Sequence, residues 1–248
     1  MEPTTRHAAV RNWLPERNAM TASRLFADRR AAGRTLAKRL VQLGLRDPVV
    51  LAMPRGGVPV AVEIARALGA PLDLVFVRKI GVPFQPELAV AAVVDGGEPL
   101  IIINDDIMTG AAVTQAFINE QAKSKLAEIE CRRRAYLAGR AHVPLEGRVL
   151  ILVDDGIATG ASVRAALAAL RRKMPKQLVL AVPVAPADIL DDLGTRVDEI
   201  VCLRKPKAFY AVGHHYIDFH QILDDEVVRL LNEGGANRPD APDHASAN

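Results

Sequence analysis

Two hydrophobic patterns take turns along this chain: short continuous apolar runs, and longer stretches in which apolar residues recur every three or four positions. Continuous apolar runs are typical of strands that are covered on both faces, and the second pattern is typical of amphipathic helices. Strands that alternate with helices in this way indicate an α/β fold built on a doubly wound, mostly parallel sheet.

The apolar runs predict where the strands lie. Strands are expected at 48–53, 72–77, 88–94, 100–103, 149–153, 177–184 and 197–203, with 88–94 and 100–103 forming a hairpin across Asp95-Gly96-Gly97. Helices are expected at 23–43, 58–68, 111–137, near 187–193, at 224–231, and directly after the strand 149–153. Gly44 and Gly69 would end the first two helices. Residues 204–221 follow neither pattern and hold four of the ten aromatic residues.

One of these segments joins a strand to a helix through a short acidic turn. The apolar run 149–153 leads into Asp154 and Asp155, and the turn 157–162 after them is made of small residues. Small residues leave backbone N–H groups free to converge on an anion at the positive end of a helix. Open α/β sheets hold their ligands at the carboxyl ends of the strands. The segment therefore predicts a phosphate-binding loop beside two carboxylates, suited to a sugar phosphate.

This segment resembles the 5-phosphoribosyl-1-diphosphate (PRPP) signature of type I phosphoribosyltransferases, in which an apolar strand and two acidic residues precede a loop ending in Thr-Gly-Ala/Gly-Thr/Ser. A P-loop is excluded because no lysine follows the glycine. The alternative is an ordinary strand-turn-helix junction with a polar tip. The resemblance implies that Asp154 and Asp155 are catalytic and hold the ribose hydroxyls and Mg²⁺. It also implies a 5′-phosphate site formed by Ala158, Thr159, Gly160, Ala161 and Ser162.

The same resemblance implies a second loop for the diphosphate leaving group. Arg55, Gly56 and Gly57 follow the strand at 48–53, and two glycines there let the backbone approach a ligand closely. Arg78 and Lys79, expected at the end of the next strand, are similar to the basic pair that neutralises diphosphate oxygens in several such enzymes. The alternatives are a plain turn at 54–57 and a solvated basic pair at 78–79.

The likeness extends from about Phe26 to Leu231 and narrows to a family of bacterial phosphoribosyltransferases whose substrate is not generally defined. It is carried by the segments Phe26-Ala-Asp-Arg29, 51–61, 78–83, 149–162 and Phe209-Tyr-Ala-Val-Gly213, with Tyr216, Asp218 and Phe219 near the end. It implies the type I phosphoribosyltransferase fold with a small C-terminal hood. Phe84-Gln85 departs from the pattern expected there, which is smaller or more polar.

The resemblance also bears on the acceptor base. Enzymes that act on 6-oxopurines place an aspartate where this chain has Ala158, so the acid–base group is missing or comes from elsewhere. Glu87, within a mobile loop expected after the basic pair, is the candidate; its alternative is a solvent-facing strand entry. Phe209 and Tyr210 are expected to contact the base as part of the hood.

Three further features have simpler explanations. The segment 104–112 repeats the Asp-Asp…Thr-Gly-Ala pattern with one residue fewer, which an ordinary helix N-cap explains. Three consecutive arginines, 132–134, are more often a solvated helix face than a nucleic-acid site. A histidine-rich stretch near the end lacks a metal-binding frame; it comprises His214, His215, Asp218 and His220.

Composition narrows the class of protein. The chain has 248 residues, half of them hydrophobic, enough for one core with a small appendage. A net charge of +3 does not indicate nucleic acid, and no apolar run reaches membrane-spanning length. Two cysteines are too few for a disulfide framework, which fits a reducing cytoplasm. We expect flexible tails at 1–20 and 233–248, a core at 21–203, and the hood with a terminal helix at 204–232.

These expectations combine into a Mg²⁺-dependent pentosyltransferase that transfers 5-phosphoribosyl from PRPP to a nitrogenous, purine-like base and releases diphosphate. The resemblance further implies a homodimer or higher homo-oligomer. The alternative is a non-catalytic regulator of the same fold that binds PRPP, a nucleotide or RNA, because binding motifs survive the loss of chemistry.

Overall fold

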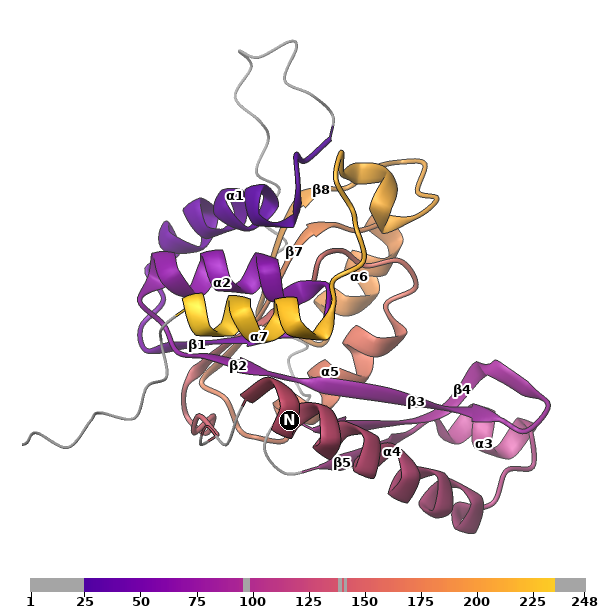
Figure 1. Cartoon of the computed structure of the whole chain (residues 1–248). Helices are drawn as coiled ribbons and strands as arrows, with labels where there is room; N and C mark the ends of the chain where they lie inside the picture. The colour runs from indigo at the N-terminus through magenta and orange to yellow at the C-terminus, as the bar shows by residue number, and fades with distance from the viewer. Residues whose placement is uncertain (1–24, 96–98, 138–139, 141, 235–248) are drawn as a thin grey trace, which may run out of the picture.

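The computed structural model describes residues 25–95, 99–137, 140 and 142–234. The predicted tail 1–20 lies outside these residues, as does 235–248. Five parallel strands form the main sheet in the order β2 (Leu72–Leu74), β1 (Pro48–Ala52), β6 (Val149–Val153), β7 (Gln177–Val184) and β8 (Glu199–Arg204). Every residue of β6 is buried, as its continuous apolar run predicts. The predicted mostly parallel α/β fold is confirmed (Figure 1).

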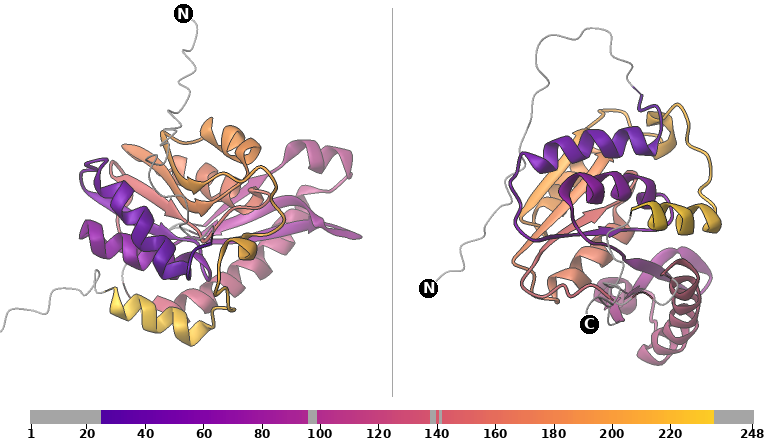
Figure 2. Two further views of the ribbon diagram at one scale, coloured as in Figure 1. Left: turned by 90° about the horizontal axis from the view of Figure 1, so that it is seen from above. Right: turned by 60° about the vertical axis from the view of Figure 1, so that its left-hand side comes forward.

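Helices cover both faces of this sheet. On one face lie α1 (Arg29–Val41), α2 (Gly57–Leu68) and α7 (Asp224–Glu233), and on the other lie α5 (Ala161–Arg171) and α6 (Ala187–Gly194) (Figures 1 and 2). The two cores use alternate residues of each strand: Ile151 and Val153 face α2, whereas Leu150 and Leu152 face α5. This alternation is why the central strands have no polar face.

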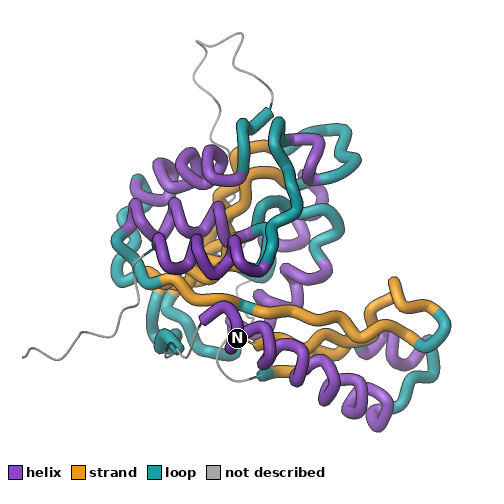
Figure 3. The backbone as a smooth tube through the Cα atoms, viewed as in Figure 1, coloured by secondary structure: helices purple, strands orange, loops and turns teal. Residues whose placement is uncertain are grey.

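A second sheet carries the hairpin and extends away from the layered core (Figures 2 and 3). It pairs β3 (Phe76–Val82), β4 (Gln85–Asp95) and β5 (Leu100–Ile103) antiparallel, and continues through α3 (Asp105–Gly110) into α4 (Gln115–Leu137). The prediction of one strand at 72–77 was wrong. Val75 still donates to the Ala52 carbonyl, but the chain then leaves β1 to pair with β4.

This division changes the setting of two predicted site segments. Arg78 and Lys79 lie inside β3 instead of at the end of a strand, and Glu87 lies in β4 instead of in a mobile loop. The long pairing of β3 with β4 accounts for both errors, because it extends ordered structure to Val82 and back from Gln85. Phe84, at the turn between them, has a positive φ of 66° and is fully exposed.

Side-chain caps explain where three helices begin. Asp28 accepts from the Ala31 N–H at 2.6 Å, so α1 begins at Arg29 and the predicted start at residue 23 was wrong. Asn104 accepts from the Ile107 N–H at 3.3 Å, which confirms the N-cap interpretation of 104–112. The Thr114 hydroxyl accepts from the Phe117 N–H, so the predicted helix 111–137 begins at Gln115.

The segment after β8 is irregular, as predicted, apart from one 3₁₀ turn, η1 (Val212–His215). We refer to residues 205–223 as the hood. It leads into α7, whose last residue, Glu233, is the first residue of the expected C-terminal tail. Within the described ranges, no helix has the length and apolarity needed to cross a bilayer.

Candidate functional site

Asp154 and Asp155 follow β6 directly and stand at the carboxyl edge of the parallel sheet, as the sequence predicts. The two carboxylates have different partners. One oxygen of Asp154, Oδ1, accepts from the Asp155 backbone N–H at 2.9 Å. Asp155 Oδ2 accepts from Arg29 Nε at 2.7 Å, and the two side chains are only 13% and 8% exposed, respectively. Asp155 is therefore ion-paired, whereas Asp154, directly before it, accepts a backbone hydrogen bond.

Burial weakens the acidity of both groups. Burial, followed by the charge of Asp155, raises the pKa of Asp154 well above its usual range. Burial also raises the pKa of Asp155, although Arg29 acts in the opposite direction. Burial disfavours the negative charge of both carboxylates, and a bound divalent cation would offset that charge. The pair is therefore suited to hold such a cation. Mg²⁺ takes six oxygen ligands, so substrate or water oxygens would have to complete its shell here.

The predicted diphosphate loop packs directly against this pair. A Cβ added at Gly57 would lie 2.7 Å from the Val153 carbonyl oxygen, and one at Gly56 would overlap Asp155 Oδ2. Gly57 therefore requires glycine because it meets backbone, and a side chain at Gly56 would displace the Asp155 carboxylate. Arg55 is brought to the same edge, where its guanidinium lies 3.4 Å from the Asp224 carboxylate. Its peptide bond with Pro54 is cis.

A pocket of about 430 Å³ lies between this loop and the hood. Its lining comprises Arg29, Arg55, Gly56, Asp155, Phe219, His220, Gln221 and Ile222. Two guanidinium groups and one carboxylate thus converge on a space large enough for a small ligand.

The predicted 5′-phosphate loop begins α5 without a side-chain cap. Gly160 adopts a left-handed φ of 74° at the N-cap position, and no side chain accepts from the first turn. Ala158 and Thr159 are exposed, while Ala161 and Ser162 are half-buried. The first N–H groups of α5 therefore have no side-chain acceptor, and such a helix N-terminus can receive an anion.

Arg164, which sequence reasoning did not identify, lies beside this loop. Its Nη1 donates to the Thr159 carbonyl at 2.9 Å, and its Nε donates to Asp192 at 2.6 Å. The guanidinium thereby fixes the backbone of the loop from outside. The motif 157–162 contained no signal for this residue, because its partner Asp192 comes from α6, a distant part of the sequence.

The basic pair is divided between the two faces of the hairpin sheet. Arg78 Nε donates to Glu128 on α4 at 2.8 Å. Lys79 lines a separate pocket of about 430 Å³ together with Ala161 and Arg164 of α5. Adjacent strand residues point to opposite faces, so β3 cannot present both cations to one ligand. Glu87 is exposed on β4 and does not line the pocket beside Asp155.

The predicted base-contacting aromatics lie elsewhere in the hood. Phe209 stacks on His215 with ring centroids 5.3 Å apart, and Tyr210 tilts against His214 at 6.2 Å. Tyr210 is 84% exposed. Neither lines the pocket beside Asp155, whereas Phe219 does. Tyr216 and Phe219 belonged to the resemblance, but nothing in their pattern indicated contacts with the carboxylate pair.

Tyr216 joins the hood to the carboxylates. Its hydroxyl donates to the Asp155 carbonyl at 2.5 Å, and its ring stacks on Phe219 at 5.1 Å. Burial and the nearby Asp155 charge raise the pKa of Tyr216, which keeps its hydroxyl a proton donor.

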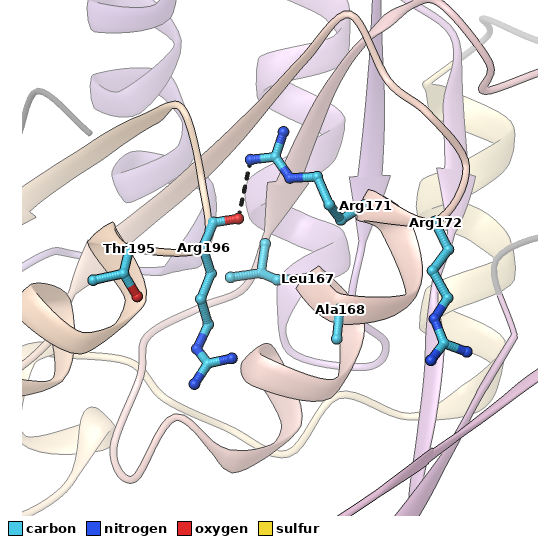
Figure 4. A pocket seen from close by; sticks show the side chains of 6 residues that line it. All are labelled: Leu167, Ala168, Arg171, Arg172, Thr195 and Arg196. Carbon is cyan, nitrogen blue, oxygen red and sulfur yellow. Dashed lines mark hydrogen bonds between the residues drawn. The ribbon is translucent and has the colours of Figure 1, made fainter. Parts of the chain in front are cut away.

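Other parts of the surface are less suited to chemistry. A further pocket, of about 520 Å³, is lined by Leu167, Ala168, Arg171, Arg172, Thr195 and Arg196 (Figure 4). Its lining holds no carboxylate. The one hydroxyl in the lining, that of Thr195, donates to the Asp192 carbonyl, and Arg171 turns toward the Arg196 carbonyl. His220 pairs with Asp218 and Glu226, and no group of three or more potential metal-binding side chains occurs within the described ranges.

Similarity to known proteins covers most of the chain. Residues 23–204 match the family model described as "Phosphoribosyl transferase domain". The chain is 47% identical over 209 residues to the Mycobacterium tuberculosis (strain H37Rv) protein named "Putative phosphoribosyl transferase Rv0571c", covering 84% of this chain and 47% of that protein. It therefore spans about half the length of the curated relatives it matches. The crystal structure of TT1426 from Thermus thermophilus is similar with a TM-score of 0.75 and 42% identity, covering 84% of this chain and 98% of that one.

Proposed function

This chain belongs to the phosphoribosyl transferase domain family, and from that premise we propose that it transfers 5-phosphoribosyl from PRPP to a nitrogenous, purine-like base. The observation that carries the proposal is the contact of Gly56 and Gly57 with the strand end that bears Asp154 and Asp155. That contact brings the loop bearing Arg55 against the carboxylate pair, and the loop 158–162 follows the same strand, at the sheet edge where α/β proteins bind ligands.

Each part has a role in the proposed reaction. The backbone N–H groups of 158–162 and the hydroxyls of Thr159 and Ser162 bind the 5′-phosphate. Asp154 and Asp155 hold the ribose hydroxyls and would hold Mg²⁺, which supplies charge neutralisation for the diphosphate when bound. Arg55 and the backbone of Gly56 and Gly57 hold the diphosphate leaving group. Lys79 has less support for this role, because it lines a separate pocket with Ala161 and Arg164.

The proposed reaction needs no covalent bond between the protein and the substrate. The bond between ribose C1 and the diphosphate oxygen breaks, the diphosphate leaves with the electron pair, and a base nitrogen bonds to C1. The ribose passes through an oxocarbenium-like state, so positioning and electrostatic stabilisation dominate. The proton on the base nitrogen needs an acceptor, and Ala158 cannot accept it. Glu87 does not line the pocket beside Asp155, so its assignment as that acceptor is the least supported of the proposed roles.

The second candidate function is a non-catalytic regulator that binds PRPP or a nucleotide, and the absence of an acid at Ala158 favours it. Its RNA-binding form has less support. Arg132 and Arg134 pair with acids of their own helix, and Arg133 is only 12% exposed because it bridges Asp73 and Asp95. Ion-paired arginines of this kind are poor candidates for phosphate contacts.

Diphosphate release separates the two functions. The protein is mixed with PRPP, Mg²⁺ and each of a panel of purine and pyrimidine bases, and diphosphate and product mass are measured. Release with one base, abolished when Mg²⁺ is chelated, is the expected result. PRPP binding by calorimetry without release from any base would favour the regulator, and absence of both would contradict either function.

A further inference from the structure

One arginine contacts both the carboxylate pair and the hood. Arg29, the first residue of α1, is 7% exposed although it is charged. Its Nε donates to Asp155 at 2.7 Å and its Nη1 donates to the His220 carbonyl at 2.9 Å. Its guanidinium carbon lies 3.7 Å from the centroid of the Phe219 ring. A single planar group therefore joins three parts of the pocket wall.

The backbone next to Arg29 is paired with the same part of the hood. Phe26 N–H donates to the His215 carbonyl at 2.8 Å, and Ile217 N–H returns a bond to the Phe26 carbonyl at 2.8 Å. Asp218 N–H donates to the Ala27 carbonyl at 2.9 Å. Residues 26–29 thus form a short connecting segment between the start of α1 and residues 215–220. The hood has a fixed attachment at this point.

We propose that Arg29 is a positioning residue that couples ligand binding at the carboxylate pair to the placement of the hood over the pocket. The inference rests on the proposed function for the identity of the ligand, PRPP. Arg29 engages only Asp155 Oδ2, so Oδ1 remains outside the ion pair and a ligand can share the same carboxylate. A group that moves Asp155 must then move Arg29, Phe219 and the His220 carbonyl with it.

The chemistry of the side chain explains why an arginine stands here. A guanidinium is a planar fork that donates in two directions and stacks on an aromatic ring at the same time. A lysine ammonium could retain the charge opposite Asp155, but it could not reach the carbonyl and cover the ring together. Coupling between two sites is reciprocal, so a hood held by Arg29 also restrains Asp155.

Hydrogen exchange tests the coupling in the full chain. Exchange of amides in 216–222 is compared with exchange in β8, with and without PRPP and Mg²⁺, in the wild type, Arg29→Met and Arg29→Lys. Calorimetry measures PRPP affinity in parallel. Arg30→Met is the matched control, because Arg30 is the next residue of α1 and pairs with Glu63 and Glu233, away from the pocket.

In the wild type and Arg30→Met, PRPP is expected to slow exchange in 216–222. In ligand-free Arg29→Met the same amides should exchange about tenfold faster while β8 is unchanged, because the opening is local. Arg29→Lys should keep PRPP affinity within about threefold, since the charge opposite Asp155 remains, yet lose the PRPP-dependent protection.

The coupling is overturned if Arg29→Lys keeps the full PRPP-dependent protection of 216–222. It is also overturned if Arg29→Met speeds amide exchange in β8 and in 216–222 equally, because that result indicates a general loss of stability. Should Arg29→Met fail to fold, Arg29→Lys alone decides between these results. A wild type that does not bind PRPP would contradict the proposed function, while the ligand-free comparison would still test whether Arg29 holds the hood.

Discussion

Two segments of this chain carry nearly the same residues and have different structures. Asp105-Asp106 leads to Thr109-Gly110-Ala111, and Asp154-Asp155 leads to Thr159-Gly160-Ala161. The first segment is the exposed helix α3, capped by Asn104. The second is a non-helical loop whose carboxylates are largely buried and contact a second loop. An acidic pair before Thr-Gly-Ala is therefore not sufficient to build a site.

The strands before the two segments account for the difference. Among the residues that the structure describes, β5 pairs only with β4 and is half-buried throughout, whereas β6 lies between β1 and β7 and is fully buried. A central parallel strand delivers its last residues to an edge where neighbouring loops also arrive. The longer spacing also provides Gly156. Both Gly156 and Gly160 have a positive φ, unlike Gly110 of α3, and this lets the second segment turn without forming a helix.

The largest expected effect compares the two acidic pairs directly. Asp154→Asn with Asp155→Asn should weaken PRPP binding by about 100-fold or more, since hydrogen bonds to charged groups contribute about 1.5–3 kcal/mol each. Asp105→Asn with Asp106→Asn, on the exposed helix, should leave it unchanged. Calorimetry with Mg²⁺ measures both. If the two double variants bind PRPP with equal affinity, the buried carboxylates have a role other than PRPP binding.

The same experiment has a stability control. Asp155→Asn leaves the buried Arg29 without its carboxylate partner, so it should lower the free energy of unfolding. Asp154→Asn keeps that ion pair and removes a group whose charge is disfavoured by burial, so it should not. Urea unfolding of the single variants checks the order.

The second prediction compares the glycines of the two regions. Gly57→Ala should destabilise the protein by about 1–3 kcal/mol, because the added methyl meets backbone of β6 that cannot move aside. Gly110→Ala meets nothing within 4 Å and should be neutral or stabilising by up to about 1 kcal/mol. Thermal unfolding measures both. If Gly57→Ala is also neutral, the two loops are not in the close contact described.

The third prediction concerns the hood, which contacts Asp155 through the Tyr216 hydroxyl and lies apart from α3 (Figure 1). Phe209→Ala and Tyr210→Ala should alter base preference more than PRPP affinity, with losses of about 1–3 kcal/mol if these rings stack on a base. Phe84→Ala, which removes an exposed ring of the hairpin turn, is the control. Turnover across several bases is compared with PRPP affinity.

Equal losses of PRPP binding and of turnover in the two hood variants would show that these rings only support the hood. The contacts of Phe209 and Tyr210 with His215 and His214 are the structural basis for that outcome.

The smallest expected effect is a pH dependence of the hood. Hydrogen bonds to Asp218 and then Glu226 raise the pKa of His220, so the folded state favours its protonated form. The stabilisation is fully present below the unfolded pKa of about 6.5 and is lost as pH rises through the raised folded value. The group is exposed, so the effect should be small and weaken with salt.

Hydrogen exchange of 216–222 in the wild type and in His220→Gln, compared at the same pH, measures this contribution. The ratio of the two rates should differ from one at a pH of about 5.5, below the unfolded pKa, and approach one at high pH. A ratio that is independent of pH would contradict the protonated contact.

The strands of the parallel sheet were predicted well because their apolar runs reflect burial on both faces. The predicted ranges 149–153 and 177–184 agree with β6 and β7 to the residue. The helix predicted at 58–68 agrees with α2 except that α2 begins one residue earlier, at Gly57. Gly69, the C-cap, has a left-handed φ that terminates the helix. The strand 72–77 was predicted less well, because an apolar run does not reveal that the chain changes partners at Val75.

The candidate site divides in the same way. The sequence by itself determined the local features: two carboxylates after a buried strand, a small-residue loop opening a helix, and a glycine pair after another strand. Each depends on neighbours within a few residues, where propensity and spacing act. Only the tertiary structure decided that the glycine pair packs against Asp154 and Asp155. It also decided that Arg78 and Lys79 face opposite sides of a strand, and that Arg29 pairs with Asp155, 126 residues away. Such choices depend on which strands become neighbours, and that is settled by packing of the whole core.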